Sequence, residues 1–268
     1  MHFLRYVYIL DPPPGQGTIQ WQAWPYLAQL GGELVHHPRL VILKARQLGL
    51  SWLLAAYGVW TAISRSASIV LLLSQGQLEA QELLGKCKFI YDHLPPWLQP
   101  TLTSDNKALL EFGLIHSAIH ALPATERAGT GFTASLVICD EHAKHPYAAA
   151  NYAALEPTVN AGAQFISVST AFGIGNYYHQ LYKGAVDGFN CFTHRFFVAL
   201  LRPGRNTEWY ERTKESFAGL PHLFHQEYPL NDSEAFVLTA GVPVFDLLAL
   251  ERLLQGIREP LSVEEYAL

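Results

Sequence analysis

The chain has 268 residues, of which 50% are hydrophobic and 15% charged, enough for one large α/β domain or two small ones with a substantial core. The formal net charge is −5 and the sequence pI about 6.2, so any DNA contact must come from a local basic patch. The cysteines are Cys87, Cys139 and Cys191. Their odd number and wide spacing argue against a disulfide framework or a metal cluster and fit a reducing cytoplasm.

Residues 1–10 are apolar but stop at Asp11 and a run of prolines. This segment is too short and too aromatic for a signal peptide, and no other run has the length of a membrane span. We therefore expect no contact with a membrane. Residues 11–18 are rich in Pro and Gly and predict a loop. The next stretch, 19–30, predicts a helix that ends at Gly31 and Gly32.

Strands and helices then alternate along the chain. A short apolar run over 40–43 predicts a buried strand, and the apolar run over 52–63 predicts a helix. The other predicted elements are buried strands at 68–74, 135–139, 165–169 and 192–201, a helix at 77–94, and a hairpin or two short strands across 109–122. This alternation favours a mostly parallel sheet with helices on both faces. Because no repeat or clear linker interrupts it, we predict one domain over 1–268, with the weakest pattern in the tail, 240–268.

The segment 41–52 predicts a phosphate-binding loop, since it forms a strand, a glycine-bearing turn and a helix N-terminus. In the pattern G-x-x-x-x-G-K-[ST], Ser51 aligns with the final Ser/Thr and Gly49 with the second glycine. Leu50 then occupies the lysine position, and Lys44 the first glycine position. An ordinary strand-to-helix turn is the alternative. The candidate nucleotide-binding residues are Lys44, Ala45, Arg46, Gln47, Leu48, Gly49, Leu50 and Ser51.

Asp140 and Glu141 directly follow the predicted strand 135–139, and ligands bind at such strand ends in open α/β sheets. Phosphoryl transfer requires Mg²⁺ and a group that orients the attacking water. We expect Ser51 and Asp140 to hold Mg²⁺ and Glu141 to polarise water. A solvated helix N-terminus, which favours acids, is the alternative.

Ser169 and Thr170 end the next predicted strand. Their hydroxyls are placed to bond the γ-phosphate of ATP or its water and to relay hydrolysis to the rest of the protein. Alternatively, they cap the helix that begins near Asn176.

In this order, the motifs resemble the ATPase region of the large terminase of tailed bacteriophages. The four stretches that carry the resemblance are 44–51, 129–141, 169–178 and 225–236. The resemblance implies a RecA-like P-loop NTPase of the additional-strand, catalytic-glutamate class, which hydrolyses ATP with Mg²⁺ and moves double-stranded DNA into a viral prohead. It also implies a portal protein and a small terminase subunit as partners. The expected state is a monomer in isolation and a homo-oligomeric ring when active, in the host cell cytoplasm.

The resemblance extends to two further residues. Gln22 stands where related motors place a glutamine that contacts adenine, although an aromatic helix face is more often part of a core. The arginine that family members insert into a neighbouring subunit's site has no counterpart at Thr130. Arg127 is the best substitute, and a solvated loop arginine is the alternative. His142 replaces the usual alanine. The sequence reaches Leu268 without the clustered acids of a terminase nuclease, so we expect no nuclease activity from it.

Two rival functions stay open from the sequence. A helicase-like nucleic-acid ATPase shares these motifs but needs a second RecA-like domain, for which 268 residues leave no room. A non-catalytic structural subunit with a decayed P-loop is supported by Leu50 in the lysine position.

The histidines His142 and His145 lack the companions of a zinc site in the sequence.

Overall fold

The structure is a computed structural model that describes residues 2–11, 16–236 and 253. The strands in this part of the chain are β1 Tyr8–Asp11, β2 Gly17–Gln20, β3 Arg39–Lys44, β4 Ile69–Ser74, β5 Ser104–Asp105, β6 Leu109–Phe112, β7 Ser117–Pro123, β8 Leu136–Asp140, β9 Gln164–Ser169 and β10 Thr193–Phe197. The first two form an antiparallel pair. The other eight form one sheet in the order β10-β3-β9-β8-β4-β7-β6-β5.

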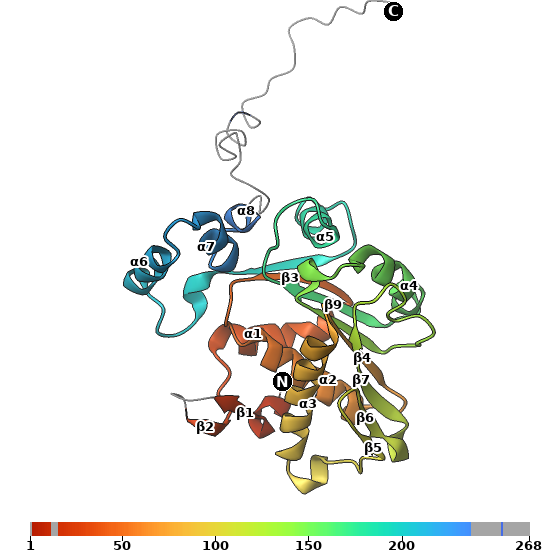
Figure 1. The fold of residues 1–268 in the computed structure, drawn as a ribbon. Coiled ribbons are helices and arrows are strands. Elements are labelled where there is room, and N and C mark those ends of the chain that lie inside the picture. Colours follow the sequence, from red (N-terminus) through yellow and green to blue (C-terminus); the bar gives the residue numbers. More distant parts are fainter. Residues whose placement is uncertain (1, 12–15, 237–252, 254–268) are drawn as a thin grey trace, which may run out of the picture.

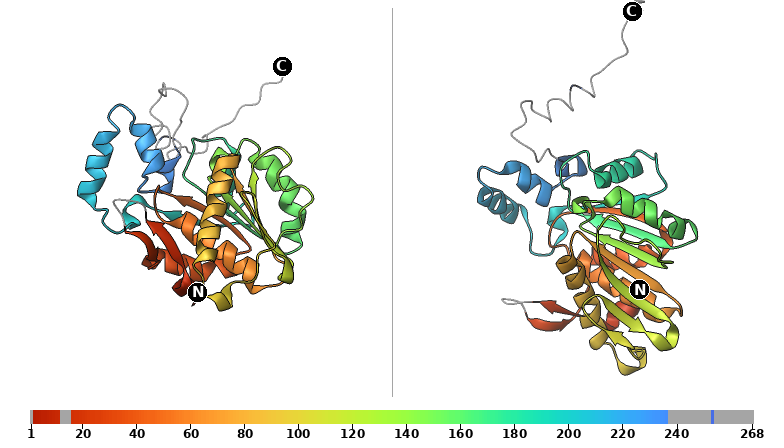
Figure 2. Two further views of the ribbon diagram at one scale, coloured as in Figure 1. Left: turned by 60° about the horizontal axis from the view of Figure 1, so that its bottom comes forward. Right: turned by 45° about the vertical axis from the view of Figure 1, so that its right-hand side comes forward.

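The α-helices of the described residues are α1 Pro25–Glu33, α2 Leu50–Ser64, α3 Gln77–Asp92, α4 Ala148–Asn160, α5 Tyr177–Val186, α6 Thr207–Ser216, α7 Pro221–Glu227 and α8 Asp232–Ala235. The 3-10 helices are η1 His2–Tyr6, η2 Leu34–His36, η3 Pro96–Leu98, η4 Gly113–Ile115, η5 His142–Lys144 and η6 Ala199–Leu201. Helices α1, α2 and α3 cover one face of the sheet, and α4 and α5 cover the other (Figures 1 and 2).

Both faces of the central strands are buried, which explains their continuous apolar runs. In β3, Leu40 and Ile42 pack in the core that includes α2 and α3, whereas Val41 and Leu43 pack in the core that includes α4 and α5. The six strands from β10 to β7 are parallel, and β6 and β5 add an antiparallel edge. The predicted α/β fold with a mostly parallel sheet is therefore confirmed.

The placement of β9 between β3 and β8 matters most for function. Leu43 pairs with Ser169 across β3 and β9, and Asp140 pairs with Val168 across β8 and β9. Parallel strands end at the same edge of a sheet. The phosphate-loop strand β3, the Asp-Glu strand β8 and the Ser-Thr strand β9 therefore end side by side at this edge. The Ser-Thr strand is the additional strand, and it lies between the other two, as predicted.

The predicted helix over 19–30 is wrong at both ends. Residues 17–20 form β2, which pairs with β1, and α1 begins only at Pro25, whose fixed φ suits the first position of a helix. The helix continues through Gly31 to Glu33 instead of ending at the glycines. A Cβ on Gly31 would lie 3.3 Å from Leu53 Cδ1, so this glycine lets α1 and α2 pack closely.

The predicted strand at 192–201 is shorter than expected, because β10 ends at Phe197 and η6 follows. The other predicted strands and helices are present within about two residues of their predicted ends. None of the helices in the described part of the chain has both the length and the apolar character needed to cross a membrane. The tail, 240–268, where the sequence pattern is weakest, lies outside the described residues apart from Leu253.

Candidate nucleotide-binding site

The loop between β3 and α2 has the backbone of an anion cradle. Gln47 and Gly49 both have left-handed φ angles, of 60° and 76°. A Cβ on Gly49 would lie 3.0 Å from Leu27 Cδ1, so this position favours glycine on both conformational and steric grounds. Within the described residues, no side chain caps the first N–H groups of α2. These groups and the helix dipole are therefore open to a phosphate.

Leu50 serves the core and not the ligand. Its side chain is 1% exposed, as is that of Leu48, and both belong to the core beneath α2. The hydroxyl of Tyr26 donates a hydrogen bond to the Leu48 carbonyl at 2.8 Å. The two leucines thus fix the loop to the hydrophobic core, and the positive charge for binding a phosphate comes from other residues.

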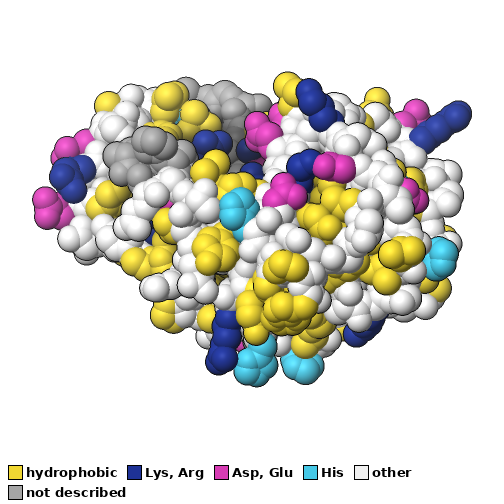
Figure 3. Space-filling view, turned by 90° about the horizontal axis from the view of Figure 1, so that it is seen from below, with side chains coloured by type: hydrophobic (Ala, Val, Ile, Leu, Met, Phe, Trp, Pro, Cys, Tyr) yellow, Lys and Arg dark blue, Asp and Glu magenta, His cyan; other side chains and the backbone are white. Residues whose placement is uncertain are grey.

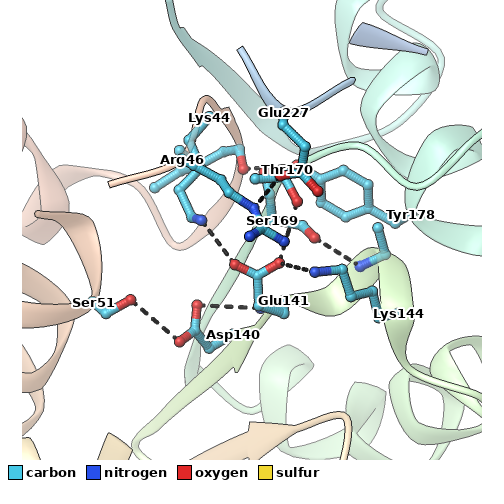
Figure 4. A network of polar contacts seen from close by, with 12 residues as sticks. Lys44, Arg46, Ser51, Asp140, Glu141, Lys144, Ser169, Thr170, Tyr178 and Glu227 are labelled. Carbon is cyan, nitrogen blue, oxygen red and sulfur yellow. Dashed lines mark hydrogen bonds and ion pairs between the residues drawn. The ribbon is translucent and has the colours of Figure 1, made fainter. Parts of the chain in front are cut away.

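Lys44 supplies that charge at the last residue of β3. Its side chain is 8% exposed, and its Nζ lies 2.9 Å from Glu141 Oε1. The other carboxylate oxygen of Glu141 accepts bonds from Lys144 Nζ at 3.1 Å and from Thr170 Oγ1 at 3.3 Å (Figure 4). Burial alone would raise the pKa of Glu141, but Lys44 and Lys144 outweigh it and lower the pKa to about 2. Glu141 is therefore ionised near neutral pH.

The two acids diverge because the backbone turns sharply between them. Glu141 has φ 50°, a left-handed conformation that costs a non-glycine residue roughly 1–2 kcal/mol. Asp140 Oδ2 consequently lies 3.4 Å from Ser51 Oγ on α2, while Asp140 Oδ1 accepts the Glu141 N–H at 3.2 Å. The sequence predicted separate roles for these neighbours, and their side chains do reach different partners (Figure 4).

The Ser51 and Asp140 pair fits a magnesium ion. Burial and the Glu141 charge raise the pKa of Asp140, because a carboxylate in this environment lacks enough compensating positive charge. A divalent cation would provide it. Hydroxyl and carboxylate oxygens are the ligands that Mg²⁺ prefers.

Ser169 and Thr170 are both fully buried and bond different groups. Ser169 Oγ accepts the Ala143 N–H at 3.1 Å and so supports the turn after β8, whereas Thr170 bonds Glu141 directly. The alternative that they cap the following helix is wrong. Asn176 caps α5 itself, by accepting the His179 N–H at 2.9 Å, because its side chain is already adjacent to the first turn.

Four residues that were not predicted from the sequence hold the site. Lys144 binds Glu141, as described above. Glu227 at the end of α7 pairs with the Arg46 side chain, and its carbonyl accepts the Arg46 N–H at 3.0 Å. Arg202 and Arg205 follow β10 and lie against the phosphate loop.

The two arginines bond the loop backbone directly. Arg202 Nη1 donates to the Gln47 carbonyl at 3.2 Å, and Arg205 Nη1 donates to the Arg46 carbonyl at 3.0 Å. The Arg205 guanidinium also lies 4.3 Å from the ring centre of Trp209. The available signal in the sequence was a pair of arginines on either side of a Pro-Gly turn, directly after the predicted strand 192–201.

Two predicted site residues stand apart from this cluster. Gln22 is exposed in an irregular segment and not on a helix, although nearby Trp24 lies beside the Gly49 backbone. Arg127 is exposed in the turn before β8, and its side chain has no hydrogen bond or ion pair with any residue that the structure describes. Their contacts with adenine and with a neighbouring subunit stay predictions.

The expectation of no metal-binding cluster needs correction. The structure brings the buried side chains of Cys139, His142 and His145 together, with their potential ligand atoms within 4.8 Å of one another. Cys139 lies near the end of β8 with its side chain on the α4 and α5 side, and η5 turns both histidines back toward it. The signal in the sequence was the cysteine three positions before His142, which the two histidines alone do not reveal.

Comparisons with known proteins identify a family and several similar folds. A profile of the family described as "Terminase large subunit, T4likevirus-type, N-terminal" matches residues 41–239. The fold is similar to that of the large terminase ATPase domain of Thermus phage P74-26, with a TM-score of 0.60 and 20% identity over 75% of this chain and 89% of that one.

Two longer proteins show the same fold. The large terminase of bacteriophage HK97 matches with a TM-score of 0.61 and 16% identity over 87% of this chain and 49% of that one. The large terminase of a thermophilic bacteriophage, solved in complex with ADP, matches with a TM-score of 0.56 and 11% identity over 72% of this chain and 50% of that one. The chain thus spans about half the length of these two proteins.

Proposed function

The chain belongs to the large terminase family, whose N-terminal region it matches, and from this we propose that it is an ATP-hydrolysing motor domain that moves double-stranded DNA into a viral prohead. The observation that best supports ATP hydrolysis is the position of Glu141. Its carboxylate is bonded by Lys44 from the phosphate-loop strand and by Thr170 from the additional strand. Glu141 thus contacts Lys44, which would bind the phosphate, and also the hydroxyl of Thr170, which would respond when the phosphate is released.

In the structure, Lys44 and Lys144 hold the Glu141 carboxylate between them. The γ-phosphate of ATP in the cradle carries more negative charge than Glu141 and competes for Lys44. Once Lys44 turns to the phosphate, Glu141 Oε1 is free to accept a proton from the attacking water. Catalysis then consists of positioning and electrostatic stabilisation, as in other phosphoryl transfers.

Ser51 and Asp140 would hold Mg²⁺, which supplies charge neutralisation at the β- and γ-phosphates. Thr170 senses the change at Glu141, because its hydroxyl donates to the oxygen that Lys144 also binds. Gln22 would contact the adenine from the segment that packs beside Gly49. Ser169, which holds the turn carrying the two acids, keeps Glu141 in position.

Arg127 would complete the site of a neighbouring subunit in a ring assembled on a portal protein, with a small terminase subunit as a further partner in the host cytoplasm. Its exposure in the turn that follows the carboxyl end of β7 supports a role in trans. The net charge of −5 favours weak DNA binding by one subunit, and the lysines and arginines on the face in Figure 3 are dispersed. Several subunits around a channel would add their local contacts.

The test is ATP turnover by the purified chain over a range of protein concentrations, with and without double-stranded DNA. We expect a dilute monomer to be nearly silent and activity to rise faster than linearly with concentration. An arginine supplied in trans contributes about 10³–10⁵ in rate in other NTPases. Arg127→Ala should remove the concentration-dependent activity, with Arg212→Ala on α6 as a control.

Three outcomes would count against the proposal. Absence of turnover at any concentration with DNA would favour a structural subunit. Strand separation of a duplex would favour a helicase. Equal specific activity in dilute and concentrated protein would exclude Arg127 as a group acting in trans.

A further inference from the structure

A second cluster of ligand-bearing side chains lies on the other side of β8 from Ser51. It consists of Cys139, His142 and His145, which are 1%, 1% and 6% exposed. Their potential ligand atoms all lie within 4.8 Å of one another. Neighbouring ligands on a tetrahedral zinc ion are roughly 3.3–3.7 Å apart, from Zn–S of about 2.3 Å and Zn–N of about 2.0–2.1 Å. The separations in the cluster are therefore within about 1.5 Å of those in a binding geometry.

Both histidines have one ring nitrogen without a partner in the described structure, although both rings are buried. These atoms are His142 Nε2 and His145 Nδ1. Buried polar atoms are nearly always bonded, and each exception needs an explanation. A bound cation would satisfy both nitrogens at once.

The partners of the opposite nitrogens fix the tautomer that a metal requires in His145 and permit it in His142. His145 Nε2 lies 2.8 Å from the Asp140 carbonyl, which can only accept, so the proton is on Nε2 and the lone pair on Nδ1. His142 Nδ1 lies 2.7 Å from Ser167 Oγ, and donation to this hydroxyl leaves the lone pair on Nε2. Metal-binding histidines are commonly oriented by such bonds from their second nitrogen.

The surroundings supply a dry shell on one side and an approach on the other. The rings of Phe165, Tyr177 and Tyr178 lie within about 6 Å of His142 between ring centres. A pocket of about 390 Å³ borders His142 and His145 and is also lined by Tyr147, Asn176 and Tyr177. An ion can enter from this pocket, and a water molecule can occupy the fourth position.

We propose that Cys139, His142 and His145 form a binding site for a thiophilic transition-metal ion, for which Zn²⁺ is the probe. One thiolate and two imidazoles suit such an ion and not Mg²⁺, which prefers oxygen. On binding, the Cys139 thiol releases its proton to solvent and a sulfur–metal bond forms. The ion would join the end of β8 to η5 and so clamp the turn that carries Asp140 and Glu141. This site is separate from the Mg²⁺ position at Ser51, and it does not depend on the proposed motor function.

The experiment uses the purified full chain in metal-free buffer. Zn²⁺ binding is measured by competition with a chromophoric chelator, and Co²⁺ is used as a spectroscopic substitute. We expect one equivalent of Zn²⁺ per chain, a rise in melting temperature, and a thiolate-to-cobalt charge-transfer band with the strong visible absorption of a tetrahedral site. Cys139→Ser should lose the band and the stoichiometric binding. Ser167→Ala should weaken binding by roughly 10–100-fold, as for other groups that orient a ligand.

Two further cysteines provide the control. Cys87 is buried in α3 and Cys191 is exposed, and the chain has three cysteines. In the double variant Cys87→Ser/Cys191→Ser, a thiolate band can come only from Cys139, so the result stands even if Cys139→Ser does not fold. A double variant without the band, or Zn²⁺ binding that folded Cys139→Ser retains in full, would overturn the proposal, since surface histidines would then account for the binding.

Discussion

The two loops that meet at Glu141 are held in place by different kinds of contact. The phosphate loop is held from a distance, because Arg46 pairs with Glu227 and Gln47 is bonded by Arg202 and Arg205, across 155 to 181 positions of sequence. The turn after β8 is held by contacts of shorter range, both within itself and from the end of the adjacent strand β9, where Ser169 and Thr170 bond it across 26 and 29 positions. Its bonds from His145 to Asp140, from Lys144 to Glu141 and within the acid pair span five positions or fewer.

This difference has a functional consequence. A turn held by its own bonds and by the adjacent strand keeps its two acids in fixed positions relative to the sheet. A loop held from the segments around α6 and α7 will respond when those helices move, so that nucleotide binding and the C-terminal part of the described chain are linked. Lys44 joins the two systems, since it belongs to the phosphate loop and pairs with the turn.

Removal of that joining residue should have the largest effect. Lys44→Ala removes the charge that we assign to the phosphates, and we expect ATP binding to weaken and turnover to become undetectable while the fold survives. Lys183→Ala, an exposed lysine on α5, is the control. Measurement is by steady-state phosphate release and by binding of a fluorescent ATP analogue. Normal turnover by the Lys44 variant would show that the displaced lysine has no catalytic role.

Loss of Glu141 from the turn after β8 should lower the rate of the chemical step and leave nucleotide binding intact. Glu141→Gln keeps the shape but removes the proton acceptor, and the expected loss in turnover is at least roughly 10²-fold with Mg-ATP binding retained. Glu126→Gln, in an exposed turn, is the matched control. The assignment of separate roles fails if Glu141→Gln and Asp140→Asn lose nucleotide affinity equally.

The long-range support of the phosphate loop is tested by Arg205→Ala. This change removes bonds from the guanidinium to the Arg46 carbonyl and the Gln47 side chain, and hydrogen bonds from charged groups contribute about 1.5–3 kcal/mol. We expect ATP affinity to fall by roughly 10–100-fold, with a smaller change in the rate at saturation. Unchanged affinity with a lowered melting temperature would mean that Arg205 stabilises the fold without shaping the loop.

The smallest expected effect is an increase in stability. Burial and the Glu141 charge raise the pKa of Asp140, so its ionisation opposes folding increasingly as the pH rises from the unfolded-state pKa through the raised one. Asp140→Asn should therefore raise the melting temperature of the nucleotide-free protein at pH 7 by roughly 2–4 °C, or about 1 kcal/mol for a domain of this size. The gap should close as the pH falls below about 3.9, the ordinary pKa of Asp. A less stable variant at pH 7 would contradict this interpretation.

The same contrast explains what the sequence could predict. The strands and the separate directions of Asp140 and Glu141 follow from apolar runs and from residues adjacent in the chain, whereas the position of β9 was expected from the family resemblance alone. Arg202, Arg205 and Glu227 were not predicted as parts of the site, because only the folded chain brings them to the loop. The failure over 19–30 has another cause. The apolar and aromatic residues in this stretch have a spacing that is typical of a helix. The pairing of β2 with β1 and the start of α1 at Pro25 nevertheless determine its structure.

In the mechanism that we propose, bound nucleotide attracts Lys44 away from Glu141 and so frees this acid for catalysis. The most direct test is a crystal structure of the wild-type chain with Mg²⁺ and a non-hydrolysable ATP analogue. We predict that Lys44 Nζ will contact the phosphates and that the 2.9 Å contact with Glu141 Oε1 will be broken, with a water molecule between Glu141 and the γ-phosphate. A bound analogue with Lys44 still paired to Glu141 would contradict the account.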